Sequence, residues 1–141
     1  MSNRLFYAVF CIATLSLGGL LYVLFRENTY IAVLFDGSEL FEKIRDMTQH
    51  IVNDFFKFYF PDYLWGLSLC FGLLLVFDPQ VLGEIICCSV SFCYGVMWEC
   101  MQLFGVLNGT GDAIDVICYL AASVTAVIIC SIRRGQNEKI Y

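Results

Sequence analysis

The stretch WECMQLFGVLNGTGDAID, residues 98–115, places three carboxylates, a glutamine and an asparagine inside a strongly apolar chain. Residues 85–97 before it and 116–132 after it contain no Asp, Glu, Asn or Gln. Its centre, NGTG at 108–111, has the composition of a turn. The stretch therefore predicts a hairpin of two apolar helices that carry their polar residues near the connecting turn.

The composition of the chain is that of an integral membrane protein. Of its 141 residues, 60% are hydrophobic and only 15% are charged, whereas soluble domains are closer to half apolar. The length fits a single domain, residues 1–141. A net charge of −5 and the lack of a basic stripe exclude nucleic acid as a partner, so the expected partner is the lipid bilayer.

Four segments are close to the roughly 20 apolar residues that a helix needs to cross a bilayer. They are residues 5–25, 58–77, 82–107 and 113–132. The first lacks the cleavage site of a secretory signal, so we expect it to be retained. Asp78 and Pro79 predict a tight turn between the second and third segments. The predicted fold is all-α, a four-helix transmembrane bundle.

The segment between the first two spans has an amphipathic helical pattern. Apolar residues recur there at intervals of three and four: Leu40, Ile44, Met47, Ile51, Phe55 and Phe58. We expect an amphipathic interfacial helix over about 38–60, ended by Pro61 and lying at the outer membrane interface. A partner-binding helix and a lid packed on the bundle are the alternatives.

Basic residues near the two termini favour a cytoplasmic position for both. Four spans put both ends of the chain on the same side of the membrane, and the residues that flank the first and last spans include Arg4, Arg133, Arg134 and Lys139. Basic residues are enriched on the cytoplasmic side of membrane proteins, although the first loop also carries some. We expect a multi-pass protein of the cell membrane with cytoplasmic N- and C-termini.

All eight cysteines lie in hydrophobic stretches, and none forms a Cys-x-x-Cys or Cys/His pattern. Free cysteine packs as a small hydrophobic residue. We therefore interpret the cysteines as packing residues and predict neither a metal site nor a cofactor.

Small and polar residues line one face of the third and fourth spans. In the third span, spacings of three and four residues put them on a single helical face: Glu84, Cys88, Ser91, Gly95, Glu99 and Gln102. The fourth span repeats the pattern with Asp112, Asp115, Tyr119, Ala122 and Ala126. Small residues let helices approach closely and polar residues need partners, so we expect these faces to point inward and the bulky faces to point to lipid.

Helix geometry gathers most of these polar residues near one leaflet. Glu84 and Glu99 are 15 residues apart, or about 22 Å along a helix. With Glu84 at the inner boundary, Glu99 lies about two-thirds of the way across a hydrocarbon core of about 30 Å. The second span begins near Asp62 from the same side. The candidate polar site therefore comprises Asp62, Glu99, Gln102, Asp112, Asp115 and Tyr119.

The residues leave more than one interpretation of this cluster. Acidic groups within a span are costly, so they need partners or a function. They could be inter-helix clasps in a structural or scaffolding subunit, with Asp112 capping the fourth span and Gln102 and Tyr119 tying the third span to the fourth. They could instead line an outward-facing cavity and act as acid or base, or bind a divalent cation. A proton or cation path from Glu84 to Glu99 is a weaker third interpretation.

Familiar catalytic motifs do not accompany the cluster. The sequence contains no zinc-binding HExxH and no GxSG, and its only histidine is His50. Hydrolase chemistry is therefore unsupported, and the prediction leans away from an enzyme.

The polar hairpin resembles the VanZ-like family of small bacterial integral membrane proteins. In that family a Glu-x-x-Gln ends one span and an Asp-x-x-Asp opens the next, as ECMQ at 99–102 and DAID at 112–115 do here. Asp62, in FPDYLW, matches the Asp that leads the preceding span of the family. The resemblance covers roughly residues 60–127.

The resemblance implies a role in the cell envelope. The family takes its name from a factor associated with resistance to teicoplanin, a glycopeptide that acts outside the membrane on cell-wall precursors. By analogy, the chain would bind or modify a lipid-linked or cell-wall-related molecule at the outer leaflet, or act with a membrane protein partner. It departs from many relatives in having NGTG where they have a loop with Arg, Tyr119 in place of Asn, and Tyr63 and Gly66 in place of Lys and His.

Overall fold

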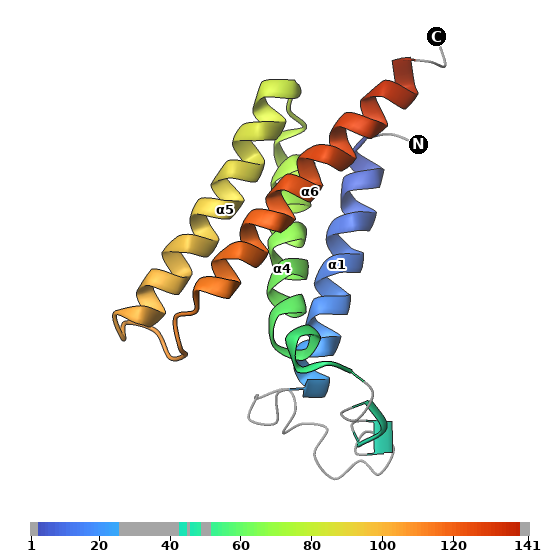
Figure 1. Ribbon diagram of the computed structural model, residues 1–141. Coiled ribbons are helices and arrows are strands. Elements are labelled where there is room, and N and C mark those ends of the chain that lie inside the picture. Colours follow the sequence, from blue (N-terminus) through green and yellow to red (C-terminus); the bar gives the residue numbers. More distant parts are fainter. Residues whose placement is uncertain (1–2, 26–42, 45, 49–51, 139–141) are drawn as a thin grey trace.

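The computed structural model describes residues 3–25, 43–44, 46–48 and 52–138. This part of the chain is helical and contains no strand (Figure 1). Its long helices are α1 (Asn3–Phe25), α4 (Asp54–Phe77), α5 (Val81–Leu103) and α6 (Ala113–Glu138). All four are long and apolar enough to cross a membrane, which confirms the predicted all-α bundle of four transmembrane helices.

Successive helices run in opposite directions, as Figure 1 shows. The N- and C-termini therefore lie at one end of the bundle, the terminal end, and the α5–α6 loop lies at the other, the loop end. Helix α4 is central and packs against α1, α5 and α6, while α5 and α6 also pack on each other. The start of α4, the end of α5 and the start of α6 share the loop end, as the hairpin interpretation requires.

The core of the bundle surrounds α4. Cys70, Phe71 and Leu74 of α4 are fully buried, and so are Ala122 and Ala126 of α6. Small residues at this contact let the two helices approach closely, so that van der Waals packing can hold them together in lipid. The outward faces carry exposed apolar residues suited to lipid tails, such as Ile12, Leu20, Val90, Val124 and Ile128.

Cysteine and serine side chains fill the interior between the helices. Four of the eight cysteines belong to the core, in keeping with their interpretation as packing residues: Cys70, Cys87, Cys88 and Cys130. Serine hydroxyls donate to backbone carbonyl groups of neighbouring helices. These hydrogen bonds join Ser68 to Cys11 at 3.1 Å, Ser91 to Gly66 at 3.2 Å and Ser123 to Cys88 at 3.0 Å. Each one satisfies a buried hydroxyl and ties two helices together.

The turn between α4 and α5 forms where Asp78 and Pro79 predict it. Asp78 adopts a left-handed conformation with φ of 43°, and its N–H bonds to the carbonyl oxygen of Leu74 at 2.9 Å. This is the geometry in which helices commonly end. Pro79 cannot continue the helix, and α5 starts after Gln80.

Helix α4 begins at Asp54, before the predicted boundary at 58, and Pro61 lies inside it. The prediction that Pro61 ends a preceding helix is therefore wrong. Proline removes one backbone donor and crowds the preceding turn, so it bends a helix more often than it stops one inside a packed membrane bundle. Figure 1 shows the first turns of α4 running across the direction of the rest of the helix, and Pro61 itself is buried.

The predicted amphipathic helix over 38–60 lies partly outside the described residues. Residues 43–44 and 46–48 are helical, whereas 54–60 form the first turns of α4 rather than a separate element. The position of this segment at the membrane interface stays a prediction.

The last two helices end at residues other than those predicted from hydrophobicity. Helix α5 ends at Leu103 rather than at 107, because Gly105 takes a positive φ of 70° and the N–H groups of Val106 and Leu107 both turn back to the carbonyl oxygen of Met101. Helix α6 continues past 132 into the polar tail. Hydrophobicity marks the membrane-embedded length, whereas backbone hydrogen bonding decides where a helix ends.

Candidate functional site

The two ends of the bundle differ in charge. Among the described side chains of the four helices and the α5–α6 loop, the loop end carries Asp54, Asp62, Glu99, Asp112, Asp115 and Lys57. Lys57 forms an ion pair with Asp54 at 2.9 Å. The terminal end carries Arg4, Arg133, Arg134, Asp78 and Glu84. The loop end, where the candidate site lies, is therefore strongly acidic.

Glu99 holds the start of α6 against the end of α5. Its side chain is buried, with 6% of its surface exposed, and its Oε2 accepts the backbone N–H of Asp112 at 3.0 Å. Asp112 in turn accepts the N–H of Ile114 through Oδ1 at 2.9 Å, which confirms its predicted role as the cap of the helix. Carboxylates at this position also interact favourably with the helix dipole.

The loop NGTG folds closely onto the last turn of α5. A Cβ on Gly111 would lie 2.8 Å from the carbonyl oxygen of Glu99, and one on Gly109 would lie 2.5 Å from the side chain of Gln102. A Cβ on Gly111 would therefore clash with the backbone of α5, and Gly109 has a φ of 137°, which favours glycine. The hairpin is thus latched by Glu99 and closed by glycines.

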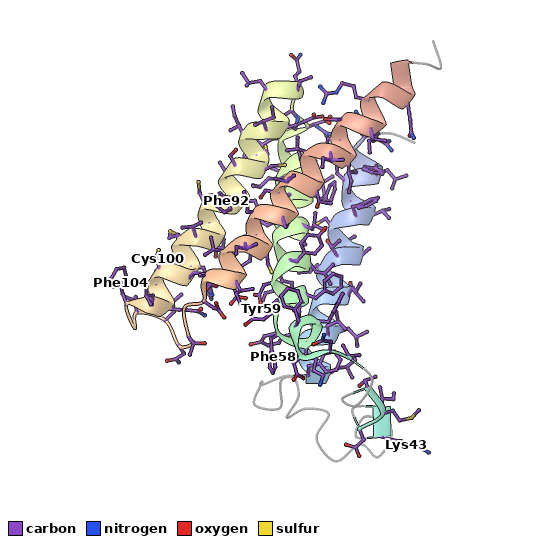
Figure 2. The ribbon with its side chains drawn as sticks, in the orientation of Figure 1. Lys43, Phe58, Tyr59, Phe92, Cys100 and Phe104 are labelled. Atoms are coloured by element: carbon purple, nitrogen blue, oxygen red, sulfur yellow. The ribbon has the colours of Figure 1, made fainter. Side chains whose placement is uncertain are left out.

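Tyr59 and Gln102 also bond to this contact. Together with Glu99 and Asp112 they form the hairpin latch, a set of four side chains that hydrogen-bond to one another or to backbone. Tyr59, labelled at the loop end of α4 in Figure 2, donates its hydroxyl to Asp112 Oδ2 at 3.2 Å and so joins α4 to the hairpin. With its amide oriented so that both ends find partners, Gln102 donates to Glu99 Oε2 and accepts from Trp98 Nε1, each at 3.2 Å. Gln102 therefore supports Glu99 within α5 and does not tie α5 to α6, contrary to the clasp interpretation.

Tyr119 lies at the junction of three helices. A Cβ on Gly95 of α5 would lie 2.5 Å from its ring, and one on Gly66 of α4 would lie 3.2 Å from it. The two glycines thus make room for the ring between α4 and α5. Its hydroxyl donates to Asp62 Oδ1 at 3.1 Å. The hydrogen bond of Tyr119 therefore joins α6 to α4, whereas the clasp interpretation expects it to join α6 to α5.

A groove of about 220 Å³ opens between α4 and α5 beside this junction. Its lining includes Gly66, Gly95 and Tyr119, together with the polar side chains of Asp62 and Ser91. The walls are formed by Trp65, Leu69, Tyr94 and Trp98. Ser91 donates to the Gly66 carbonyl group and Tyr119 donates to Asp62, so the hydroxyl protons of both are already used inside the bundle.

The structure divides the six residues of the predicted site into separate groups. Asp62 and Tyr119 line the groove, whereas Glu99, Gln102 and Asp112 form the hairpin latch. The sixth residue, Asp115, is half-buried in the first turn of α6. Within the described residues, no group of three or more His, Cys, Asp and Glu side chains is arranged to hold a metal ion.

Sequence reasoning missed the aromatic residues that make the groove. Tyr94 and Trp98 belong to the bulky face of α5 that was expected to meet lipid alone, yet they form one wall of the groove while remaining 49% and 39% exposed. Their spacing of four residues was a usable signal, because it stacks two aromatic rings along one helical face. Tyr59, one turn before Asp62, was also missed, although it lies at the hairpin and bonds to Asp112 rather than lining the groove.

The path between Glu84 and Glu99 is closed by packing. Glu84 forms an ion pair with Arg134 at 2.8 Å, and the face that leads toward Glu99 is filled by Cys88 and Ser91, both almost fully buried. The interpretation of this face as a proton or cation path therefore finds no continuous polar route among the described residues.

Four apolar helices, joined by buried side-chain hydrogen bonds and with outer faces suited to lipid, define a multi-pass membrane protein. Compared with known proteins, the chain matches no protein-family model, no curated protein and no solved structure.

Proposed function

We propose that the chain is a VanZ-like membrane protein of the cell envelope that binds a lipid-linked or cell-wall-related molecule at the outer leaflet. The observation that carries this proposal is the groove between α4 and α5, which combines apolar aromatic walls with one carboxylate. Ligand sites typically have this composition, with mostly apolar walls and a few polar groups that fix orientation. A volume of about 220 Å³ suits the head of an amphiphile rather than a whole molecule.

The charge distribution supports an orientation with the loop end outside. Arg4, Arg133 and Arg134 all lie at the terminal end, and basic residues are enriched on the cytoplasmic side of membrane proteins. In this orientation the protein lies in the cell membrane with both termini in the cytoplasm. The groove then lies in the outer half of the bilayer, where a cell-wall precursor is accessible.

Binding is better supported than modification of the ligand. General acid–base and nucleophilic catalysis need a nucleophile within hydrogen-bond reach of a base. In the groove, the hydroxyl of Tyr119 donates to Asp62 and the hydroxyl of Ser91 donates to a backbone carbonyl group. This arrangement positions a carboxylate but provides no activated nucleophile.

The test is glycopeptide susceptibility in a bacterial host that expresses the chain. The intact protein is expected to raise the inhibitory concentration of teicoplanin, and Leu69→Phe, which fills the groove from α4, is expected to return it to the level of the empty vector. Leu69→Met conserves the side-chain volume and serves as the matched control. Equal resistance from both variants, at equal amounts of inserted protein, would contradict the proposal.

A structural or scaffolding subunit is the second candidate function. The observation in its favour is the latch, in which Glu99, Asp112 and Tyr59 bond to one another or to backbone rather than facing a cavity. For this function, Glu99→Gln and Asp115→Asn are expected to lower thermal stability in detergent or to abolish expression. Normal melting together with a lost phenotype would argue against it.

A further inference from the structure

We infer that the chain binds an anionic phospholipid at its terminal end, with the lipid phosphate between α1, α5 and α6 and an acyl chain along the contact of α5 and α6. This site is separate from the groove between α4 and α5 and does not depend on the ligand of that groove. Two cavities on the same pair of helices support it: a polar pocket that carries two arginines, and an apolar groove deeper in the membrane.

The polar pocket, called the terminal pocket here, has a volume of about 280 Å³. It lies at the end of the bundle where α1 and α5 start and α6 ends (Figure 1). Its lining includes Arg133 and Arg134 of α6, Tyr7 of α1, and Gln80 and Glu84 at the start of α5. Among the described residues that line it, two positive charges therefore stand against one carboxylate. This balance attracts an anion.

Both arginines are held in position before a ligand arrives. Arg134 Nη2 donates to Glu84 Oε2 at 2.8 Å. Arg133 Nε donates to Asn3 Oδ1 at 3.2 Å, and its guanidinium carbon lies 4.0 Å from the centre of the Phe6 ring. Orienting the side chains in advance lowers the entropic cost of binding. The attraction between a phosphate and these two charges does not depend on which of their N–H groups already have a partner.

The start of α5 reinforces the arginines. Gln80 and Val81, where this helix begins, both line the terminal pocket. In the described structure, the side chain of Gln80 makes no capping hydrogen bond to the helix. The N–H groups of the first turn and the helix dipole therefore add to the attraction for a phosphate.

An apolar groove of about 240 Å³ identifies the anion as part of a lipid. It lies between α5 and α6, and its lining includes Ile85, Phe92, Leu120 and Val124. Ile85 directly follows Glu84 of the terminal pocket, and Phe92 lies about two turns further along α5. Pocket and groove thus follow one another along α5, in the order in which a headgroup and its acyl chain enter a bilayer.

The expected leaflet agrees with the charge of the ligand. In the proposed orientation, the terminal end faces the cytoplasm, and anionic lipids give the cytoplasmic leaflet a negative surface potential. Basic pockets between transmembrane helices on this side bind anionic headgroups in other membrane proteins. A lipid is therefore favoured over a soluble phosphate, which would leave the apolar groove uncovered.

Thermal unfolding of the purified full chain in an uncharged detergent tests the inference. Three additives would be titrated: phosphatidylglycerol, phosphatidylcholine with the same acyl chains, and inorganic phosphate. Phosphatidylglycerol is expected to reach half-maximal stabilisation at a lipid-to-detergent ratio at least about fivefold lower than phosphatidylcholine, since one basic residue changes the affinity for an anionic lipid by about this factor. Inorganic phosphate at the same concentrations should leave the melting temperature unchanged.

Two arginine variants separate the terminal pocket from the general charge of this end. Arg133→Gln removes one charge from the lining and is expected to raise the half-maximal ratio for phosphatidylglycerol about fivefold. Arg4→Gln removes the same charge at the same end, but Arg4 is paired with Asp78 and lies outside the described lining. This control should keep the ratio of the intact chain. Each shift is measured against the same variant without lipid, so a change in basal stability does not alter the comparison.

A second pair of variants tests the position of the acyl chain. Ser89 lines the apolar groove, so Ser89→Phe fills part of it and should weaken stabilisation by phosphatidylglycerol. Ser16→Phe, on the exposed face of α1, adds the same side chain outside both cavities and should have no such effect. Equal effects of these two variants would overturn the assignment of the acyl chain to the groove.

Three further outcomes would overturn the lipid site. Equal stabilisation by the two lipids would show that the headgroup charge is not recognised. An equal weakening in Arg133→Gln and Arg4→Gln would assign the preference to the overall charge of the terminal end rather than to the pocket. Stabilisation by inorganic phosphate as strong as that by phosphatidylglycerol would make the ligand a soluble anion.

Discussion

The hydroxyl of Tyr119 donates to Asp62 Oδ1 across 3.1 Å, and this bond connects the fourth transmembrane helix to the central one. The phenol ring reaches Asp62 because Gly66 and Gly95 leave space for it on both sides. One side chain thus determines the packing of three helices and the position of the carboxylate in the groove.

Removing the Tyr119 hydroxyl is expected to destabilise the bundle modestly. Tyr119→Phe keeps the ring between the glycines but removes this donor from Asp62. For a partly buried group, the free energy of unfolding should fall by about 1–3 kcal/mol. Thermal unfolding in detergent measures the effect. Tyr63→Phe, which removes a hydroxyl bonded to Thr125 at 3.1 Å, is the control and is expected to cost less, because neither partner is charged. The explanation would be wrong if the two variants melted at the same temperature.

Adding a methyl group at Gly95 is expected to be more damaging than adding one at Gly19. A Cβ there would lie 2.5 Å from the Tyr119 ring, so Gly95→Ala forces α5 and α6 apart at a cost of about 1–3 kcal/mol. Gly19→Ala provides the comparison, since its Cβ would meet no atom within 4 Å. A melting temperature lowered only by Gly95→Ala supports the junction, and equal melting of both variants would contradict it.

The hairpin latch predicts a difference between two substitutions of Glu99. Glu99→Ala removes the acceptor of the Asp112 N–H and is expected to cost about 1–3 kcal/mol. Glu99→Gln retains a carbonyl oxygen and loses only the charge near the start of α6, so its effect on thermal stability should be smaller. Identical losses in the two variants would show that the charge, and not the hydrogen bond, holds the hairpin.

The fold could be predicted from the sequence because a membrane imposes simple rules. Apolar runs of spanning length gave the four helices, and a turn at Asp78 and Pro79 separated two of them as expected. The prediction failed at Pro61, since local propensity says that proline ends helices, whereas packing against neighbouring helices keeps α4 continuous and bends it.

The candidate site was predicted only as a set of polar residues at one end of the bundle. Helical spacing put Asp62, Glu99 and Tyr119 near one another, because their positions depend on helix geometry and topology alone. Whether a carboxylate meets a backbone N–H, as Glu99 does, or a groove, as Asp62 does, depends on helix rotation and on close contacts at glycines. Periodicity puts Tyr94 and Trp98 on one face of α5 but does not say that this face borders a groove, so the aromatic walls were not found.

The proposed orientation predicts which loops can be labelled from outside the cell. Thr110 is exposed in the α5–α6 loop, so Thr110→Cys is expected to react with a membrane-impermeant maleimide on intact cells. Gly135→Cys, at the terminal end, should react only after the membrane is permeabilised. The unsubstituted chain, whose eight cysteines all lie within the helices, is the control for background labelling. Labelling of Gly135→Cys on intact cells would reverse the orientation.

The last prediction concerns the two ion pairs at the terminal end, which differ in burial. Arg134 meets Glu84 at 2.8 Å with side chains 32% and 12% exposed, whereas Arg4 meets Asp78 at 3.0 Å with side chains 66% and 40% exposed. Arg134→Met leaves Glu84 half-enclosed without its cation and is expected to cost about 1–3 kcal/mol, between the values for exposed and fully buried pairs. Arg4→Met should cost less than about 1 kcal/mol, because water solvates Asp78 when its partner is removed. Thermal unfolding of both variants in the same detergent measures the difference.

If Glu84→Gln restored the melting temperature of Arg134→Met, the loss would come from the carboxylate of Glu84 left without its cation. A double variant no more stable than Arg134→Met would instead assign the loss to the missing packing of the arginine side chain.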